Sequence, residues 1–277
     1  MRILLTGANG FLGARLTRDI LTAGWDLLAT GSGNCRLPVP EFAAVSYQPM
    51  ELTDPLAIAN VFSSFQPEIV IHSGAMSRPD ECELNQGKAW DVNVNATSYM
   101  LDRSAFFKAH FIFISTDFVF DGTGGPYSEE DQPAPVNYYG LTKYEAEKKV
   151  MAYAHDWSIV RTILVYGNPI VPRNYILSTV EEKLRKGEEY KLVNDQFRTP
   201  TYVNDLSAGI LAMVQRQAKG IFHLSGEERM TPYQMGCELA RLKGLDAGLL
   251  KPVTADIFEE DRKSTRLNSS HANISYA

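Results

Sequence analysis

The sequence contains few cysteines, no excess of basic residues and no long apolar run. Its three cysteines are widely spaced and form no CxxC pair, so we expect free thiols, without a disulfide framework or a metal centre. The net charge of −6 argues against nucleic acids and membrane surfaces as partners, because both attract a basic face. No stretch approaches the roughly 18 uncharged apolar residues of a membrane span. Because Met1 leads straight into Ile3–Leu5 without the regions of a signal peptide, we expect a cytoplasmic protein.

The composition is that of an ordinary globular protein. Hydrophobic residues make up 44% of the chain and charged residues 22%, which is typical of neither disordered nor fibrous sequences. A length of 277 residues allows one large core, or one domain with a smaller lobe attached.

The end of the sequence does not resemble a protein segment. Residues 261–277 are polar and lack periodicity, which is also common in a disordered C-terminus. The run from Asp261 to His271, however, is the in-frame translation of a short-read sequencing adapter. An index and the bases that follow it account for Ala272 to Ala277. We therefore expect 261–277 to be an artefactual tail.

Strand-like runs alternate with helical patterns through the first 165 residues. The expected strands are Ile3–Thr6, Asp26–Thr30, Ala44–Tyr47, Ile69–His72, Phe111–Ser115 and Ser158–Thr162. The expected helices are Phe11–Ala23, Pro55–Phe65, Gln86–Phe107 and Tyr139–Ala154. This alternation predicts an α/β fold with a Rossmann-like, doubly wound parallel sheet. Ligands bind such sheets at the carboxyl ends of the strands.

A glycine-rich segment follows the first expected strand and opens the first expected helix. It reads Gly7-Ala8-Asn9-Gly10-Phe11-Leu12-Gly13. Glycine permits the sharp turn, the close approach of the backbone to a pyrophosphate and the packing of helix on strand. The helix N-terminus adds free N–H groups and a partial positive charge. Tight turns use glycine anyway, but this position in the chain favours a dinucleotide cofactor.

The end of the second strand distinguishes NAD from NADP. A carboxylate there would hold the ribose 2′-hydroxyl, but the chain from Thr30 to Arg36 contains no acid. Ser32, Asn34 and Arg36 can bind a 2′-phosphate, or the segment is a flexible turn with a solvated arginine. We predict an NADP(H)-binding domain over 1–165, with NAD(H) as the alternative cofactor. Residues 166–260 are predicted to form mainly a small, interleaved substrate lobe, with returning segments that pack on the first domain.

Two further motifs are typical of acid–base chemistry at a carbonyl. Ser115-Thr116 ends the fifth expected strand, and Tyr139 and Lys143 lie four residues apart, on one face of a helix. A tyrosine with the usual pKa of about 10 is a poor acid–base catalyst near neutrality. A lysine cation nearby should lower that pKa by roughly 1–3 units. The Thr116 hydroxyl is then free to bind a substrate carbonyl. The same Tyr–Lys spacing also occurs by chance on amphipathic helices.

These motifs carry a family resemblance from Met1 to about Glu260. GANGFLG, STDFVFDG, PYSEEDQPAPVNYYGLTKYEAE and DQFRTPTYVNDL resemble the dTDP-4-dehydrorhamnose reductases, a family of extended short-chain dehydrogenases. This resemblance implies NAD(P)H-dependent reduction of a nucleotide-linked 4-keto-6-deoxysugar. RPDECELNQ and GIFHLSGEERMTPYQM are similar to the regulatory β subunits of methionine adenosyltransferase. That similarity implies, as the alternative, an NADP-binding regulator whose partner is methionine adenosyltransferase.

The resemblance also implies roles for individual residues, and it implies no metal site. The catalytic set is Thr116, Tyr139 and Lys143. With the residues named above, the cofactor set is Gly7, Gly10, Phe11, Leu12, Gly13, Ser32, Arg36, Leu52, Ala75, Met76, Asn93, Ser115, Tyr139 and Lys143. The substrate set is Arg78, Asp117, Phe118 and Arg198. Asn93 could instead bond backbone within its helix, and the two arginines could be surface charges.

The chain departs from the reductases at two positions. Phe118 stands where they usually have a tyrosine, and Leu164 where they commonly have a tryptophan. Both changes put the sugar specificity in question, although the catalytic set is intact. A dehydratase would have a glutamate after Asp117, which this chain lacks. We therefore predict a reductase first and a regulatory subunit second, and leave a homodimer open.

Overall fold

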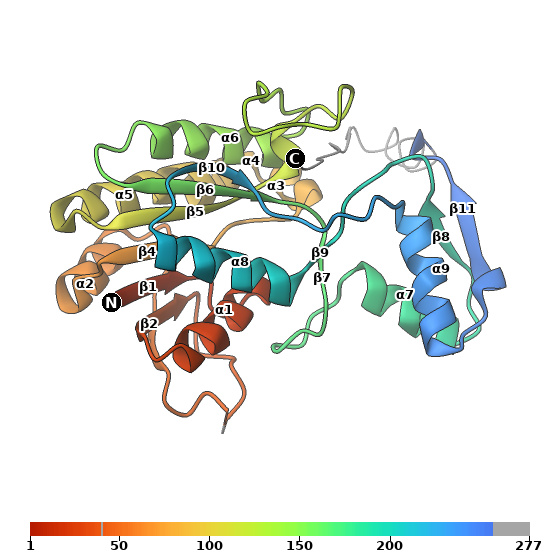
Figure 1. Ribbon diagram of the computed structural model, residues 1–277, viewed down its shortest axis with the longest axis horizontal. Coiled ribbons are helices and arrows are strands. Elements are labelled where there is room, and N and C mark those ends of the chain that lie inside the picture. The colour runs from red at the N-terminus through yellow and green to blue at the C-terminus, as the bar shows by residue number, and fades with distance from the viewer. Residues whose placement is uncertain (40, 257–277) are drawn as a thin grey trace.

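A seven-stranded sheet, all of whose strand pairs are parallel, organises the molecule (Figure 1). The computed structural model describes residues 1–39 and 41–256, and the predicted artefactual tail lies outside these residues. The strand order is β10-β6-β5-β4-β1-β2-β3. The strands are β1 (Arg2–Thr6), β2 (Asp26–Gly31), β3 (Ser46–Pro49), β4 (Ile69–His72), β5 (His110–Thr116), β6 (Trp157–Thr162) and β10 (Gly220–His223). The order reverses between β1 and β4, so the predicted doubly wound α/β fold is confirmed.

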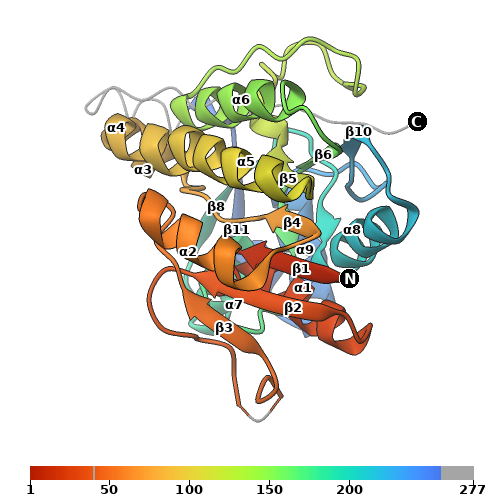
Figure 2. The ribbon, with the colours of Figure 1, turned by 90° about the vertical axis from the view of Figure 1, so that its left-hand side faces the viewer.

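Alternate residues of the central strands enter two different cores. Ile3 and Leu5 of β1 pack with helices α1 (Phe11–Thr22) and α8 (Val203–Arg216) on one face of the sheet. Leu4 packs with α2 (Pro55–Phe65), α5 (Ala96–Phe107) and α6 (Tyr138–Met151) on the other. Figure 2 shows α5 and α6 side by side over that face. A strand covered on both faces is apolar throughout, which explains the unbroken run in the sequence.

Three expected elements differ by more than one residue from those observed. The helix expected over Tyr139–Ala154 is α6, which ends at Met151. The third strand begins at Ser46 rather than Ala44, because the Val45 amide donates to the Phe42 carbonyl oxygen in a turn (3.0 Å). The helix expected over Gln86–Phe107 is divided into α4 (Gln86–Trp90), a π-helical turn η1 (Asp91–Asn95) and α5. A π-helical turn contains one residue more than an α-helical turn, and the hydrophobic pattern of the sequence does not reveal it. Such turns occur often at functional sites.

A smaller lobe has its own apolar core. It consists of α7 (Ile176–Arg185), β8 (Tyr190–Val193), α9 (Pro232–Lys243), η3 (Ala247–Leu249) and β11 (Leu250–Val253), with β8 and β11 paired in parallel. Val180, Leu184 and Leu192 meet Ala240 and Leu250 there. Figure 1 shows this lobe beside the carboxyl ends of the central strands.

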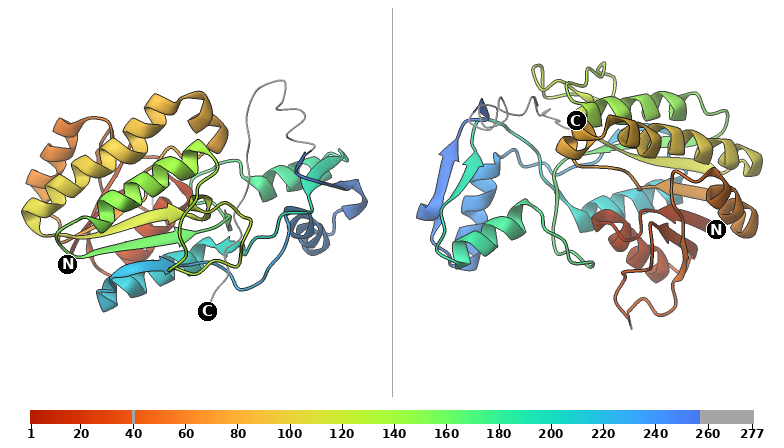
Figure 3. Two further views of the ribbon diagram at one scale, coloured as in Figure 1. Left: turned by 90° about the horizontal axis from the view of Figure 1, so that it is seen from above. Right: turned by 180° about the vertical axis from the view of Figure 1, so that it is seen from behind.

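The chain passes between sheet and lobe more than once. After β8 it returns through β9 (Thr201–Tyr202), which pairs with β7 (Val165–Tyr166), and continues into α8 and β10 (Figure 3). α8 packs on α1, where the Ser207 hydroxyl donates to Asp19 (2.6 Å). β10 completes the edge of the main sheet beside β6. The chain then re-enters the lobe as α9. No helix in 1–39 and 41–256 is both long and apolar enough to cross a bilayer.

Candidate active site

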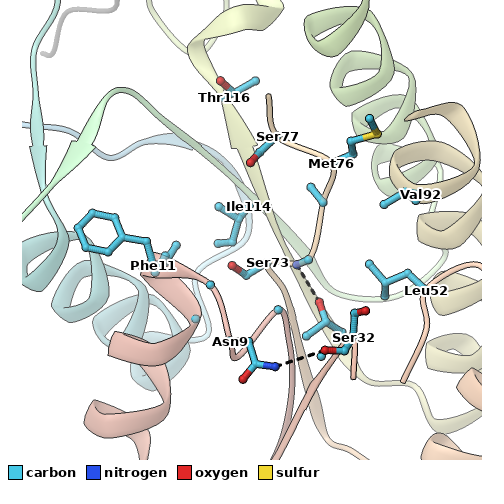
Figure 4. Close-up of a pocket in the computed structure, with 18 of the residues that line it drawn as sticks. Asn9, Phe11, Ser32, Leu52, Ser73, Met76, Ser77, Val92, Ile114 and Thr116 are labelled. Atoms are coloured by element: carbon cyan, nitrogen blue, oxygen red, sulfur yellow. Dashed lines mark hydrogen bonds between the residues drawn. The ribbon is translucent and has the colours of Figure 1, made fainter. Parts of the chain in front are cut away.

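A cavity of about 700 Å³ lies at the carboxyl ends of the strands, where the strand order reverses. Figure 4 shows Asn9 and Ser32 at one end of it and Thr116 at the other. Most of the predicted site residues line this cavity: Gly7, Gly10, Phe11, Leu12, Gly13, Ser32, Arg36, Leu52, Ala75, Met76, Ser115, Thr116, Asp117, Phe118, Tyr139 and Lys143. Asn93, Arg78 and Arg198 are not among the lining residues.

The glycine-rich loop is packed too tightly for side chains. Gly7 has a φ of 74°, and a Cβ there would lie 2.8 Å from the Gly74 amide nitrogen. A Cβ on Gly13 would lie 2.0 Å from the carbonyl oxygen of Gly7. Gly10 caps α1 without a side-chain hydrogen bond, so the first turn of the helix keeps N–H groups for a ligand.

Asn9 fixes the turn after β2 at the other wall of the cavity. Its side-chain amide donates to the carbonyl oxygen of Asn34 (3.0 Å) and accepts from the Arg36 amide (2.8 Å). The Ser32 hydroxyl donates to the carboxylate of Glu51 (2.6 Å), which also lines the cavity. The segment 30–36 contains no acid, but the expectation that no acid would lie beside a 2′-phosphate was wrong, because Glu51, just after strand β3, brings a carboxylate here.

Arg173 is a cavity-lining residue that the sequence did not reveal. Its guanidinium lies 6.0 Å from the ring centroid of Phe11, which stacks on Tyr175 (5.5 Å). The Tyr175 hydroxyl donates to the Gly167 carbonyl oxygen (2.7 Å) and so ties down the segment before α7. Partial loss of hydration, then the nearby charges of Arg78 and Arg36, lower the pKa of Arg173. Positive charge therefore gathers beside the glycine-rich loop.

Thr116, Asp117 and Tyr139 meet at the end of β5. The Thr116 hydroxyl donates to Asp117 Oδ1 (3.0 Å), and it lies close enough to the Tyr139 phenol to act on the pKa of that group. Asn137 places Tyr139 in the first turn of α6 by accepting from the Gly140 amide (2.8 Å). Burial raises the pKa of Tyr139, and the Asp117 carboxylate acts in the same direction.

The Lys143 side chain is bonded to the backbone of β5. Its Nζ donates to the Ile114 carbonyl oxygen (2.8 Å) and lies 3.9 Å from the centroid of the Phe113 ring. Burial lowers the pKa of Lys143 to about 7, against the pull of Glu147. The expected lowering of the Tyr139 pKa by Lys143 was therefore wrong for this structure, because desolvation outweighs the Thr116 hydrogen bond that favours the phenolate.

Ser115 turns away from Thr116 into a buried ion pair. Its hydroxyl donates to Glu147 Oε1 (2.5 Å), and Glu147 Oε2 accepts from Arg161 Nη2 (2.7 Å). The side chains of Glu147 and Arg161 are 0% and 1% exposed. This network joins β5, α6 and β6 directly behind the cavity.

Asn93 does not line the cavity but holds the backbone of Met76, which does. It lies in the π-helical turn, where its side chain accepts from the Met76 amide (2.8 Å) and donates to the Met76 carbonyl oxygen (3.0 Å). It also donates to the Thr142 hydroxyl (2.9 Å). The alternative prediction that Asn93 bonds the backbone therefore holds, but the backbone it bonds lies in a loop and not within its own helix.

The two arginines of the predicted substrate set occupy different environments. Arg78 is exposed and pairs with Glu81 (2.8 Å) three residues further on, as expected of a surface charge. Arg198 is buried and pairs with Asp117 (3.2 Å), so the surface-charge alternative was wrong for Arg198. Its burial could not be read from a loop sequence.

The two departures from the reductase pattern both line the cavity. Phe118 meets Tyr139 edge to face, with ring centroids 5.6 Å apart. Leu164 has a φ of 38°, a left-handed conformation that is rare for a branched side chain and marks local strain.

Comparisons with known proteins agree with this geometry. A family model described as the RmlD substrate binding domain matches residues 1–272, which runs past the start of the predicted tail. The methionine adenosyltransferase 2 subunit beta of Rattus norvegicus is 32% identical over 259 residues, 91% of this chain and 75% of that protein. The spore coat polysaccharide biosynthesis protein SpsK of Bacillus subtilis is 29% identical, over 92% of this chain and 84% of that protein.

The solved structures that are similar include reductases. A dTDP-4-dehydrorhamnose reductase from Bacillus anthracis, solved in complex with NADP, has a TM-score of 0.85 and 26% identity. The match covers 99% of this chain and 90% of that one. A dTDP-4-dehydrorhamnose reductase from Clostridium acetobutylicum has a TM-score of 0.81 and 29% identity, over 93% and 85% of the two chains.

Proposed function

Since the chain belongs to the RmlD substrate binding domain family, we propose that it is an NAD(P)H-dependent reductase of a nucleotide-linked 4-keto-6-deoxysugar. One observation carries the proposal. Thr116, Tyr139 and Lys143 line the same cavity as the glycine-rich loop. A protein that only binds a dinucleotide has no need of a hydroxyl, a phenol and an amine at its far end.

The residues present fit a dinucleotide cofactor. Gly7 and Gly13 have no room for a Cβ, so only glycine lets the loop turn this tightly into α1, whose first-turn N–H groups would bind a pyrophosphate. Ser32 and Arg36 would hold the adenosine end of the cofactor. Ala75 and Met76 form the wall of the cavity toward Thr116. When bound, NADPH supplies the hydride.

The balance between NADPH and NADH is set by charge at the adenosine end. Glu51 accepts from Ser32 and disfavours a 2′-phosphate, or binds the ribose hydroxyls of NADH. Arg36 opposes it at the same end, and Arg173 adds a second cation beside the glycine-rich loop. Two guanidinium groups against one carboxylate favour NADP(H), with NAD(H) accepted less well.

Tyr139 is suited to donate a proton to a reduced carbonyl. Its raised pKa keeps the phenol protonated at neutral pH, and an alkoxide is a far stronger base than a phenolate. Thr116 lines the cavity beside the same phenol and can orient the substrate carbonyl. Lys143 holds the end of β5 through the Ile114 carbonyl oxygen.

The substrate side of the cavity suits a sugar nucleotide. Lys88 and Phe118 line it and offer a cation for phosphate and an aromatic surface. Arg78 lies at the start of α3 (Pro79–Leu84), close enough to Arg173 to influence its pKa. Arginine and lysine side chains are the usual protein partners of a diphosphate.

A second function is favoured by the relatives. The proteins 32% identical to this chain are named as the beta subunit of methionine adenosyltransferase 2. The alternative is therefore an NADP-binding regulatory subunit whose partner is a methionine adenosyltransferase. Phe118 and Leu164, where reductases usually have tyrosine and tryptophan, favour this alternative.

The reductase is tested by following NADPH oxidation at 340 nm with dTDP-4-keto-6-deoxymannose. Tyr139→Phe should bind NADPH about as tightly as wild type and lose most turnover. Tyr138→Phe is the matched control, because it removes a phenolic hydroxyl from the adjacent residue, which does not line the cavity.

Normal turnover by Tyr139→Phe would refute the mechanism. Tight NADPH binding by wild type without any turnover would refute the reductase and favour the regulator. Co-purification with a methionine adenosyltransferase would then test the second function.

A further inference from the structure

The single proton of the Thr116 hydroxyl is committed to Asp117. The hydroxyl donates to Asp117 Oδ1 (3.0 Å) and accepts from the Phe118 amide (3.3 Å). A hydroxyl carries one proton and two lone pairs. While its proton points to Asp117, the Thr116 hydroxyl has only a lone pair left to offer a ligand in the cavity. It cannot donate to a substrate carbonyl at the same time.

Asp117 is held in place from the opposite side. Its Oδ2 accepts from Arg198 Nη1 (3.2 Å), and the two side chains are 2% and 7% exposed. The backbone of Arg198 is fixed in turn by two hydrogen bonds with Met230 (2.9 and 2.8 Å). Asp117 therefore has one oxygen committed to Arg198 and the other to Thr116.

We propose that Asp117, held by Arg198, is a positioning residue that decides whether the Thr116 hydroxyl donates into the cavity. The inference rests on the proposed reductase function. With Asp117 ionised, Thr116 donates to it and Tyr139 is the only donor of the pair to the substrate carbonyl. With Asp117 protonated, its O–H donates to Thr116, and the Thr116 proton turns to the carbonyl. Only the proton on Asp117, exchanged with water, distinguishes the two states.

The surroundings of Asp117 place this change near neutral conditions. Burial raises the pKa of Asp117 to about 6, although Arg198 and the Thr116 hydrogen bond lower it. The titratable side chains on the same side of the site as Thr116 and Asp117 are Tyr139 of α6 and Cys82 of α3. Both have raised pKa values, so both are neutral near pH 7. Arg198 is the cation paired with Asp117. A carbonyl that receives two hydrogen bonds is more polarised than one that receives a single bond.

The first test needs no turnover. The titration of Asp117 is followed by the carboxyl signal of ¹³C-labelled aspartate in the full chain, with Asp117→Asn to assign it. Thr116→Val removes the donor to the ionised carboxylate, so the midpoint should move upward by about 0.5–1 pH unit. Thr116→Ser should restore it. Asp121, which bonds Thr123 and Tyr127, is the internal control and should not move.

The second test is the pH profile of reduction. Turnover by wild type should fall about fivefold as Asp117 ionises, the effect of one hydrogen bond. In Asp117→Asn the side-chain amide donates to Thr116 at every pH, so the fall should vanish while the KM for NADPH stays the same. A profile unchanged in Asp117→Asn would overturn the proposal.

The two tests separate this inference from the proposed function. No wild-type turnover, together with a midpoint that shifts in Thr116→Val, refutes the reductase and supports the hydroxyl arrangement. A midpoint that does not respond to Thr116→Val refutes the arrangement, whatever the turnover.

Discussion

Replacing Glu147 tests how the end of β5 is held behind the cavity. Its carboxylate has no solvent exposure and accepts from Ser115 Oγ (2.5 Å), Arg161 Nε (3.1 Å) and Arg161 Nη2 (2.7 Å). Glu147→Met fills a similar volume but removes the carboxylate that accepts these hydrogen bonds. Arg161 is then left as a buried cation without its partner, and Ser115 without its acceptor.

The cost follows from the burial of the pair. Removing one partner of a buried ion pair costs about 3–5 kcal/mol, because the remaining charge stays uncompensated. A domain of this size loses roughly 2–4 °C in Tm for each kcal/mol, so the expected fall in Tm is about 6–20 °C. Glu147→Met/Arg161→Met removes both charges and should be far less destabilised than the sum of the single variants.

Urea unfolding of wild type, both single variants and the double variant, at pH 7, closes a double-mutant cycle. The partly exposed pair of Glu181 and Arg185 is the control, and Glu181→Gln, which also loses the pairing with Lys243 (3.8 Å), should lose less than about 1 kcal/mol. Single-variant losses that add up in the double variant would show that Glu147 and Arg161 do not compensate each other, and would refute this reasoning.

Three further predictions concern the cavity itself. Gly13→Ala places a Cβ 2.0 Å from the Gly7 carbonyl oxygen, so the loop must move. Fluorescence titration should show that the affinity for NADPH is reduced more than tenfold. An unchanged affinity would contradict the tight packing of the loop. The pKa of Lys143 is about 7 in the folded chain, which is below its value in the unfolded chain. Above pH 7 the unfolded chain therefore binds more protons than the folded chain, so the free energy of unfolding should rise from about pH 7 toward pH 10. Lys143→Met should lack this rise, which is worth roughly 4–5 kcal/mol, in urea unfolding at successive pH values. Arg36→Ala and Arg173→Gln should each weaken NADPH more than NADH, and equal losses would mean that neither contacts the 2′-phosphate.

Local patterns in the sequence were sufficient for the sheet and the loop at its edge. Ile3, Leu4 and Leu5 form an apolar run because β1 is covered on both faces, and this can be read without knowing the neighbours. Gly13 is fixed by its contact with Gly7, six residues earlier, which is why the spacing of the glycines is informative, whereas Gly7 also packs against the distant Gly74.

Features set by distant segments could not be predicted. Glu51 reaches Ser32 from the next strand, and Arg173 reaches the loop from a segment far along the chain. The state of Tyr139 depends on its burial and on Asp117, whereas the sequence shows only its spacing from Lys143. Spacing identifies which groups meet, but desolvation decides their pKa values.

The late return of α8 and β10 to the main sheet has a consequence for synthesis. Leu12 and Leu16 of α1 pack on α8, and the free edge of β6 is covered only by β10. During translation, a chain that has emerged only to Thr162 would expose both this apolar helix face and an unpaired strand edge. The sheet closes only once His223 has left the ribosome, after the first part of the lobe. Ribosome-bound intermediates of this protein are therefore expected to need chaperone protection until that point.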